Sequence, residues 1–187
     1  RSGKPGASGA GGDTIRAKLL EVIEPGPGRQ IPPCPYYGEC GGCSLQHLGE
    51  QAEQDWKRQI VVDALARRGL EDVTVAPTRL IKRDSRRRTR WTAIRAGGRL
   101  LMGYQKKGTN EVVDIETCAV LDPKLNAIIA DVRNLISTLK IHKKGLGIAA
   151  TLTDTGIDLT IEAPGEPDME LRMRLSEFAQ KHEIPRL

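Results

Sequence analysis

Three of the four cysteines lie within ten residues of one another, and this cluster constrains the fold more than any other feature. Cys34, Cys40 and Cys43 fall in a segment rich in glycine and proline, and 74 residues lie between Cys43 and Cys118. The chain has no recognisable secretory signal, and reduced surroundings disfavour a disulfide framework. Clustered cysteines in that setting favour metal binding or redox chemistry. We therefore expect all four thiols to converge on one site.

Two kinds of metal centre use four thiolates, and the spacing alone leaves both open. A cubane iron–sulfur cluster needs four soft ligands and backbone amides that hydrogen-bond its sulfides, and Gly41-Gly42 offers such amides without a Cβ in the way. A tetrahedral zinc ion takes the same ligands but is usually held by paired C-x2-C segments. Only one such pair occurs here, so the spacing favours iron–sulfur. Unpaired core cysteines are a third possibility, but a loop rich in proline and glycine disfavours it.

The positive charge is concentrated in one window of the chain. The net charge is +5, yet residues 79–107 contain eleven basic residues and a single acid, so the remainder is acidic. A basic block in an otherwise acidic chain indicates a partner with negative charge, most simply RNA, although a solvated surface is the simpler alternative. The candidate RNA contacts are Arg86, Arg87, Arg88, Arg90, Lys106 and Lys107.

The pattern of apolar residues predicts an α+β fold, with an antiparallel sheet and packed helices. We expect strands at 14–23, 73–81, 89–95, 100–105, 111–115, 146–153 and 156–162. Helices are expected at 46–69, 123–139 and 168–182, with Asp122 as an N-cap and Trp56 packed against the sheet. Gly97-Gly98 predicts a hairpin turn. Trp91 is expected in the core, with stacking on an RNA base as the alternative.

Several segments together resemble a known enzyme family. Residues 33–48, PCPYYGECGGCSLQHL, resemble the cluster-binding segment of the iron–sulfur RNA 5-methyluridine methyltransferases. These enzymes use S-adenosylmethionine to methylate uracil C5 in ribosomal or transfer RNA. Further similarity lies in Gln51, Gln54 and Lys57, in the arginines at 86–88, and in residues 101–104 and 112–118. Ser85 departs from the family pattern, because an aromatic residue usually stands there.

The resemblance implies a division of the chain and of its chemistry. Cys34, Cys40, Cys43 and Cys118 would hold a structural 4Fe-4S cluster. Residues 1–30 would be a flexible start followed by the last strand of an OB-like barrel, residues 31–70 the cysteine loop and a helix, and residues 71–187 a central RNA-contacting domain. The catalytic Rossmann-like domain that binds S-adenosylmethionine would follow residue 187. No catalytic or cofactor-binding residue is therefore expected in this chain, which we expect to be a piece of a longer protein.

Other functional classes remain as alternatives. An electron carrier similar to plant-type ferredoxins has a comparable C-x4-C-x2-C segment, but the five-residue gap here and the basic block disfavour it. A zinc-bound structural module that binds RNA is the other alternative. The sequence has no run of 18 apolar residues, so we expect no membrane partner and a cytoplasmic protein. The oligomeric state is left open.

Overall fold

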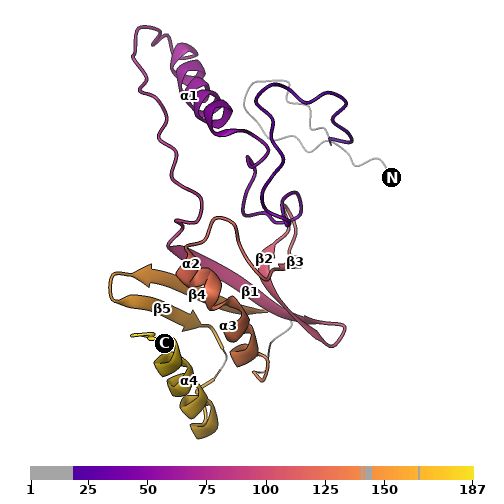
Figure 1. The fold of residues 1–187 in the computed structure, drawn as a ribbon, viewed down its shortest axis with the longest axis vertical. Coiled ribbons are helices and arrows are strands. Elements are labelled where there is room, and N and C mark those ends of the chain that lie inside the picture. Colours follow the sequence, from indigo (N-terminus) through magenta and orange to yellow (C-terminus); the bar gives the residue numbers. More distant parts are fainter. Residues whose placement is uncertain (1–18, 140, 142–144, 164) are drawn as a thin grey trace.

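A five-stranded antiparallel sheet forms the centre of the computed structural model, which describes residues 19–139, 141, 145–163 and 165–187. The strand order is β3-β2-β1-β4-β5 (Figure 1). The strands are β1 (Arg88–Ala96), β2 (Arg99–Gln105), β3 (Val112–Asp114), β4 (Leu146–Thr153) and β5 (Gly156–Ile161). Five of the seven predicted strands are therefore present, and all of their pairings are antiparallel.

The central hairpin turns at the predicted glycine pair. Gly97 and Gly98 join β1 to β2 with φ angles of 56° and 79°. Positive φ at both central residues is the geometry of a tight turn whose twist matches the flanking strands, and glycine adopts it without steric cost. The register that follows places Thr92 opposite Gly103 and Ile94 opposite Leu101.

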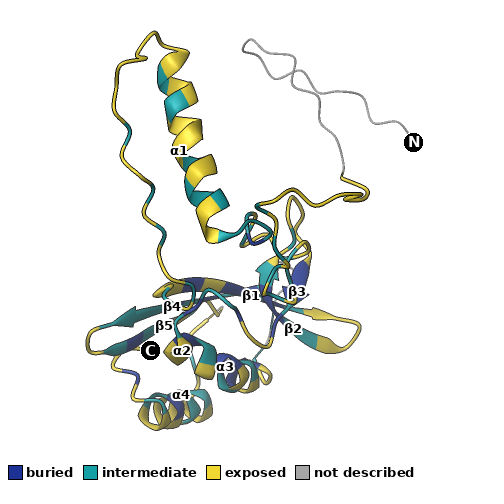
Figure 2. Cartoon of the chain, turned by 45° about the horizontal axis from the view of Figure 1, so that its top comes forward, coloured by how far each residue is buried: buried dark blue, intermediate teal, exposed yellow. Residues whose placement is uncertain are grey.

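Three helices cover one face of the sheet, as Figure 2 shows. They are α2 (Pro123–Ala127), α3 (Ile129–Ile136) and α4 (Met169–Lys181). The carboxylate of Asp122 accepts a hydrogen bond from the Lys124 amide and caps α2, which confirms that prediction. The single helix expected at 123–139 is instead broken at Ile128, whose φ of −90° and ψ of −5° depart from regular helical geometry.

The core lies between these helices and the sheet. The period-2 alternation of β1 turns Thr89, Trp91 and Ala93 inward and leaves Arg88 and Arg90 exposed. Trp91 is fully buried, which confirms its core placement. The large, fully buried side chains are Trp91, Met102, Ile115, Leu121, Leu125, Ile129, Val132, Ile136, Leu146, Ile148 and Leu159. No helix covers the opposite face of the sheet in the described part of the chain (Figure 2).

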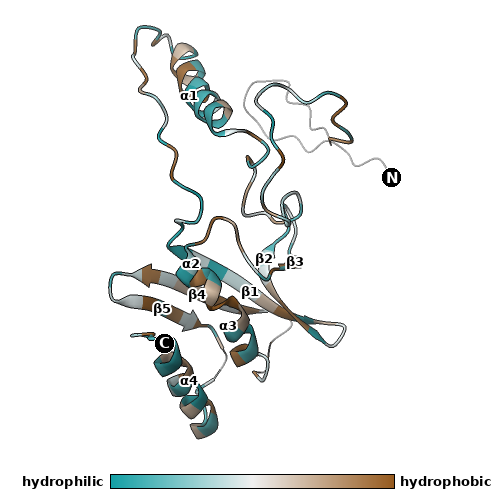
Figure 3. Cartoon of the chain, in the orientation of Figure 1, coloured by the Kyte–Doolittle hydropathy of each residue, from teal (hydrophilic) through white to brown (hydrophobic). Residues whose placement is uncertain are grey.

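Helix α1 (Glu50–Ala66) confirms the helix predicted here, but it stands away from the sheet, and two other predictions for this region were wrong (Figures 1 and 3). Trp56 is 48% exposed rather than packed on the sheet, and α1 has no buried residue. The strand predicted at 73–81 is absent, because this segment lies alongside α1 and pairs with no strand. Arg58 Nε donates to the Val75 carbonyl at 3.0 Å, and Thr78 Oγ1 donates to the Gln54 carbonyl at 3.0 Å.

The N-terminal strand prediction is only partly covered by the structure. Residues 19–23 form no strand, and residues 1–18 lie outside the described residues. The expected OB-like strand is therefore absent from residues 19–23, and the only β-bridge formed by the described residues up to 30 links Arg29 to Leu48. Helix α1 begins at Glu50 rather than at Gln46, because Gln46 belongs to the cysteine loop. Among the described helices, none is long and apolar enough to span a membrane.

Candidate metal centre and RNA-facing surface

All four cysteines line one small cavity. The cysteine loop contributes Cys34, Cys40 and Cys43, and the segment after β3 contributes Cys118. The other lining residues are Tyr36, Tyr37, Gly42, Gln46, Arg86, Tyr104, Ile115, Thr117 and Val120. The structure thus brings together the four residues that the sequence predicts as ligands, although 74 residues separate Cys43 from Cys118.

Backbone hydrogen bonds hold the cysteine loop in tight turns. The Tyr37 amide donates to the Cys34 carbonyl at 3.1 Å, and the Cys40 amide donates to the Tyr36 carbonyl at 2.9 Å. The nearly buried Gln46 side chain accepts from the Cys34 amide at 3.3 Å. These bonds satisfy backbone groups that would otherwise be exposed in a loop without regular structure.

The loop is also fixed to the hairpin formed by β2 and β3. The Gly41 amide donates to the Gln105 carbonyl at 2.9 Å, and Cys40 forms an isolated bridge with Lys106. A Cβ on Gly41 would lie 2.9 Å from the Gln105 carbonyl oxygen, so a side chain here would push the loop away from β2. Gly41, which we expected to expose its amide, therefore also lets the cysteine loop approach β2 closely.

Cys118 is held by a side chain that the sequence analysis did not single out. The Asn126 side chain in α2 accepts from the Cys118 amide and donates to the Cys118 carbonyl, both at 2.9 Å. Tyr36 connects the two halves of the site, because its hydroxyl accepts from the Glu116 amide at 3.0 Å. No spacing or periodicity marks Asn126 or Tyr36 for these roles. They become evident only when the two segments are seen side by side.

The thiols surround a cavity rather than a point. No group of three or more His, Cys, Asp or Glu side chains within the described residues is close enough to hold a single metal ion. The Gly42 amide donates to Cys40 Sγ at 3.4 Å, which is the type of contact that stabilises a thiolate. Burial raises the pKa of the Cys40 thiol, and its cysteine neighbours raise it further, while the Gly42 bond opposes them. The Cys40 thiol therefore resists ionisation.

Three of the predicted RNA-binding residues form ion pairs within the chain. Arg87 contacts Asp154 at 2.8 Å, Arg90 contacts Glu162 with both guanidinium nitrogens at 2.5 Å, and Lys106 contacts Glu111 at 3.1 Å. The Arg90 hydrogen bonds are the main cause of the lowered pKa of Glu162. The basic block is thus partly neutralised by acids from other segments, a pairing that the local charge count could not show.

The other three predicted RNA-binding residues differ from one another. Arg88 and Lys107 are exposed and have no acidic partner among the described residues. Arg86 instead reaches the wall of the cysteine cavity, and its backbone bridges to Leu121. Arg88 and Arg90 lie on the uncovered face of the sheet, while Lys106 and Lys107 follow β2 at its end.

Comparison with known proteins gives consistent names. No protein-family profile matches the chain. An uncharacterized RNA methyltransferase of Brucella suis is 35% identical over 175 residues, which cover 94% of this chain and 42% of that protein. A 23S rRNA (uracil(1939)-C(5))-methyltransferase of Shewanella amazonensis is 36% identical over 175 residues, which cover 90% of this chain and 39% of that protein.

The chain is homologous to part of the RNA methyltransferases. A third relative, an uncharacterized RNA methyltransferase of Caulobacter vibrioides, is 33% identical over 183 residues. The chain spans about two fifths of the length of the first two relatives. The resemblance to RNA (uracil-C5) methyltransferases inferred from the cysteine segment is thereby confirmed at the level of the family.

Tyr104 is a further residue that the cysteine motif left out of the site. It lines the cysteine cavity, and its hydroxyl lies 2.7 Å from the Thr89 hydroxyl. Burial raises the pKa of the Tyr104 hydroxyl well above its usual range. Tyr104 belongs to the segment 101–104 that carried part of the resemblance, but no motif or spacing places it beside Cys118.

Proposed function

We propose that this chain is the cluster-carrying and RNA-contacting segment of an RNA (uracil-C5) methyltransferase that uses S-adenosylmethionine. The single observation that carries the proposal is the meeting of four cysteines at one cavity in a chain related to RNA methyltransferases. The ligands of the cluster would be Cys34, Cys40, Cys43 and Cys118.

The arrangement of the thiols supports a 4Fe-4S cluster more than a zinc ion. A tetrahedral zinc ion has Zn–S bonds of about 2.3 Å, which requires its sulfurs to lie within about 4 Å of one another. Among the described residues, no group of three or more His, Cys, Asp or Glu side chains is placed to hold one metal ion. A cubane cluster spaces its four thiolates farther apart, because each binds a different iron atom. Thiols around a cavity, with a glycine amide directed at one of them, fit that requirement.

A structural role for the cluster follows from where its ligands lie. When bound, the cluster would supply four iron–thiolate bonds between the cysteine loop and the segment after β3. The hydrogen bond between Tyr36 and Glu116 already joins these segments, and Gly41 joins the loop to β2. The cluster would add covalent strength to that junction and fix the loop against the β2–β3 hairpin, whose turn carries Lys106 and Lys107.

Methyl transfer itself is proposed to occur outside this chain. Methylation of uracil C5 requires a free thiolate that adds at C6, a base and a pocket for the sulfonium cofactor. All four cysteines of this chain are assigned to the cluster, and Gly147 lies within β4 rather than in a turn before a helix. The name of the Shewanella amazonensis relative specifies 23S rRNA, which makes ribosomal RNA the proposed substrate.

RNA binding by this chain is expected to depend strongly on salt, because each cation that contacts a phosphate releases condensed counterions. Arg88 and Lys107 are the variants to make, since both are exposed and neither has an acidic partner among the described residues. Changing Arg88→Gln and Lys107→Gln together is expected to flatten the plot of log Kd against log salt by about 2. Titration of a labelled ribosomal RNA fragment by fluorescence anisotropy measures this slope.

The matched control removes two cations from the helix layer, Lys124→Gln and Arg172→Gln, both of which are exposed. The control is expected to leave the slope near that of the unchanged chain. Equal flattening by both pairs would show that the basic block is only a solvated surface, and the proposed RNA contact would then be withdrawn.

A further inference from the structure

A groove lies between the cysteine loop and the β2–β3 hairpin, on the side of β1 that no described helix covers. Gly41 and Gly42 form one wall, and the turn from Lys107 to Asn110 forms another. Its volume is about 660 Å³, which is within the range of about 300–1,000 Å³ that small-molecule sites occupy. The groove therefore has room for a nucleotide beside the proposed cluster.

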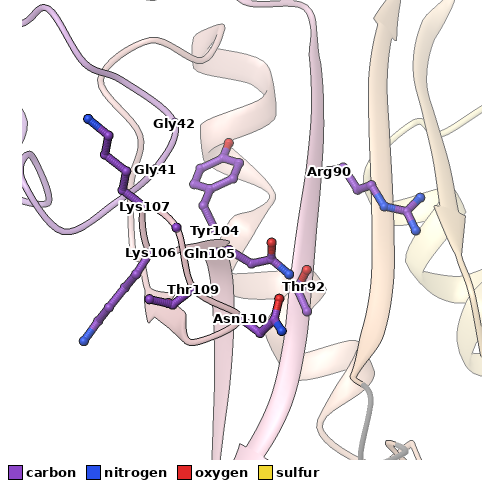
Figure 4. A pocket seen from close by; sticks show the side chains of 11 residues that line it. Gly41, Gly42, Arg90, Thr92, Tyr104, Gln105, Lys106, Lys107, Thr109 and Asn110 are labelled. Atoms are coloured by element: carbon purple, nitrogen blue, oxygen red, sulfur yellow. The ribbon is translucent and has the colours of Figure 1, made fainter. Parts of the chain in front are cut away.

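Three polar side chains gather in this groove. Thr92 pairs with Gly103, so Gln105 is its diagonal neighbour on the same face of the sheet. Figure 4 shows the polar ends of Thr92, Gln105 and Asn110 directed toward one another. None of these three side chains has a hydrogen-bond partner elsewhere in the described residues. Together they present amide donors, amide acceptors and a hydroxyl to whatever enters the groove.

The charge around the groove is positive. Its lining contains Arg90, Lys106 and Lys107 and no acidic residue. In Figure 4, Arg90 lies on the β4 side of the polar group, and the two lysines extend from the opposite side of the hairpin. Arg90 and Lys106 have acidic partners, whereas Lys107 has none among the described residues. A phosphate beside the groove would therefore meet its unpaired cation at Lys107.

We propose that this groove binds one unpaired nucleotide of an RNA strand, with Gln105 and Asn110 on the base edge and Lys107 on a flanking phosphate. This inference rests on the proposed function, which supplies RNA as the partner. Amide side chains carry a donor and an acceptor side by side, which complements the hydrogen-bonding edge of a base. Only an unpaired nucleotide leaves that edge free, because RNA duplexes are recognised mainly by shape and backbone.

Hydrogen bonding, rather than stacking, is the mode of recognition that fits this site. Aromatic residues make up only 3% of the chain, and the one aromatic residue in the lining, Tyr104, turns its hydroxyl to Thr89. We therefore expect the side-chain amides of Gln105 and Asn110 to provide the groove's contribution to RNA affinity, and we expect this contribution to differ between bases. Phosphate contacts through Lys107 would act equally on every sequence.

The test compares the binding of single-stranded oligouridine and of a fully paired RNA duplex of the same length. The variant carries Gln105→Ala and Asn110→Ala, and the control carries Gln59→Ala and Asn134→Ala, which remove two exposed amides from helices α1 and α3. Loss of two hydrogen bonds of about 1 kcal/mol each corresponds to about 10-fold to 30-fold weaker binding. We expect the groove variant to show that loss with oligouridine and to bind the duplex with unchanged affinity. We expect the control variant to bind both RNAs with unchanged affinity.

Lys107→Gln provides the complementary measurement. It is expected to lower the salt slope by about 1 for both RNAs without changing the preference between oligouridine and oligoadenosine. The Gln105 and Asn110 variant is expected to reduce that preference. Circular dichroism and iron content, measured on each variant, are expected to match those of the unchanged chain.

Oligouridine affinity that is the same in the groove variant and the control would overturn the groove assignment, and so would an equal loss for the duplex. Failure of the groove is distinguishable from failure of the proposed function. Iron and sulfide in the chain together with an inert groove variant would refute the groove alone. A chain without iron and sulfide whose groove variant still loses oligouridine would refute the cluster and leave the groove in place.

Discussion

Replacing Cys118 by serine is expected to remove most of the iron and sulfide from anaerobically purified protein, from about four of each per chain to well below one. Cys118 is the only ligand candidate outside the cysteine loop, and it is buried against the core. A serine hydroxyl is a much harder ligand than a thiolate and binds iron in such clusters poorly. Without its fourth ligand, the cluster would lose the bond that joins the loop to the segment after β3.

Thr117→Ser is the matched control for this variant, because Thr117 is the neighbouring residue and also lines the cavity. It is expected to keep the full iron and sulfide content. Limited proteolysis is expected to cut the loop between Cys34 and Cys43 faster in the Cys118 variant than in the control. Unchanged metal content after Cys118→Ser would mean that the fourth ligand lies elsewhere and that the cavity is misassigned.

Gly103→Ala is expected to destabilise the chain by about 3 kcal/mol, or about 10 °C in Tm for a chain of this size. A Cβ at Gly103 would lie 2.1 Å from the Val113 carbonyl oxygen and 3.1 Å from the Ile115 side chain. These are backbone and core atoms on β3 and just after it, so they cannot rotate away. Thermal unfolding followed by circular dichroism measures the change.

The same substitution tests how the sheet supports the site. The strand that Gly103 would displace leads through Ile115 to Cys118, so we also expect Gly103→Ala to retain less iron although all four cysteines remain. Gly26→Ala is the control, because a methyl group there meets nothing within 4 Å. A Tm for Gly103→Ala equal to that of the control would show that β2 and β3 do not pack as described.

The local sequence pattern was sufficient to predict those strands, turns and caps that are determined by neighbouring residues. The strands β1 and β2, the glycine pair between them and the cap of α2 were all predicted, because short-range sterics and hydrogen bonds determine them. The segment 73–81 has the same extended character, yet it forms no strand. Its neighbour is α1, and Pro77 has no amide hydrogen with which to pair in a sheet.

Contacts between distant segments could not be predicted in the same way. The helical spacing of Trp56 and Ile60 indicated an apolar face, but periodicity does not say what covers a face, and both residues are exposed. The ion pair between Arg90 and Glu162 crosses β4 above Gly147, where a Cβ would lie 2.8 Å from the guanidinium. Neither residue reveals the other in the sequence, because the sheet order brings them together.

The candidate site also combines residues that the sequence predicts with residues that it does not. The cysteine spacing was specific enough to predict all four ligand candidates, because four soft ligands must converge on one centre. The side chains that position them were not predicted. Asn126 and Tyr36 act through hydrogen bonds to the backbone of another segment, and such bonds leave no spacing in the sequence.

Iron and sulfide analysis of the chain purified without oxygen tests the central claim most directly. We expect a brown protein with about four irons and four sulfides per chain, bound through Cys34, Cys40, Cys43 and Cys118. One zinc per chain without sulfide would contradict the account, because it would place a single ion where the thiols are proposed to surround a cubane.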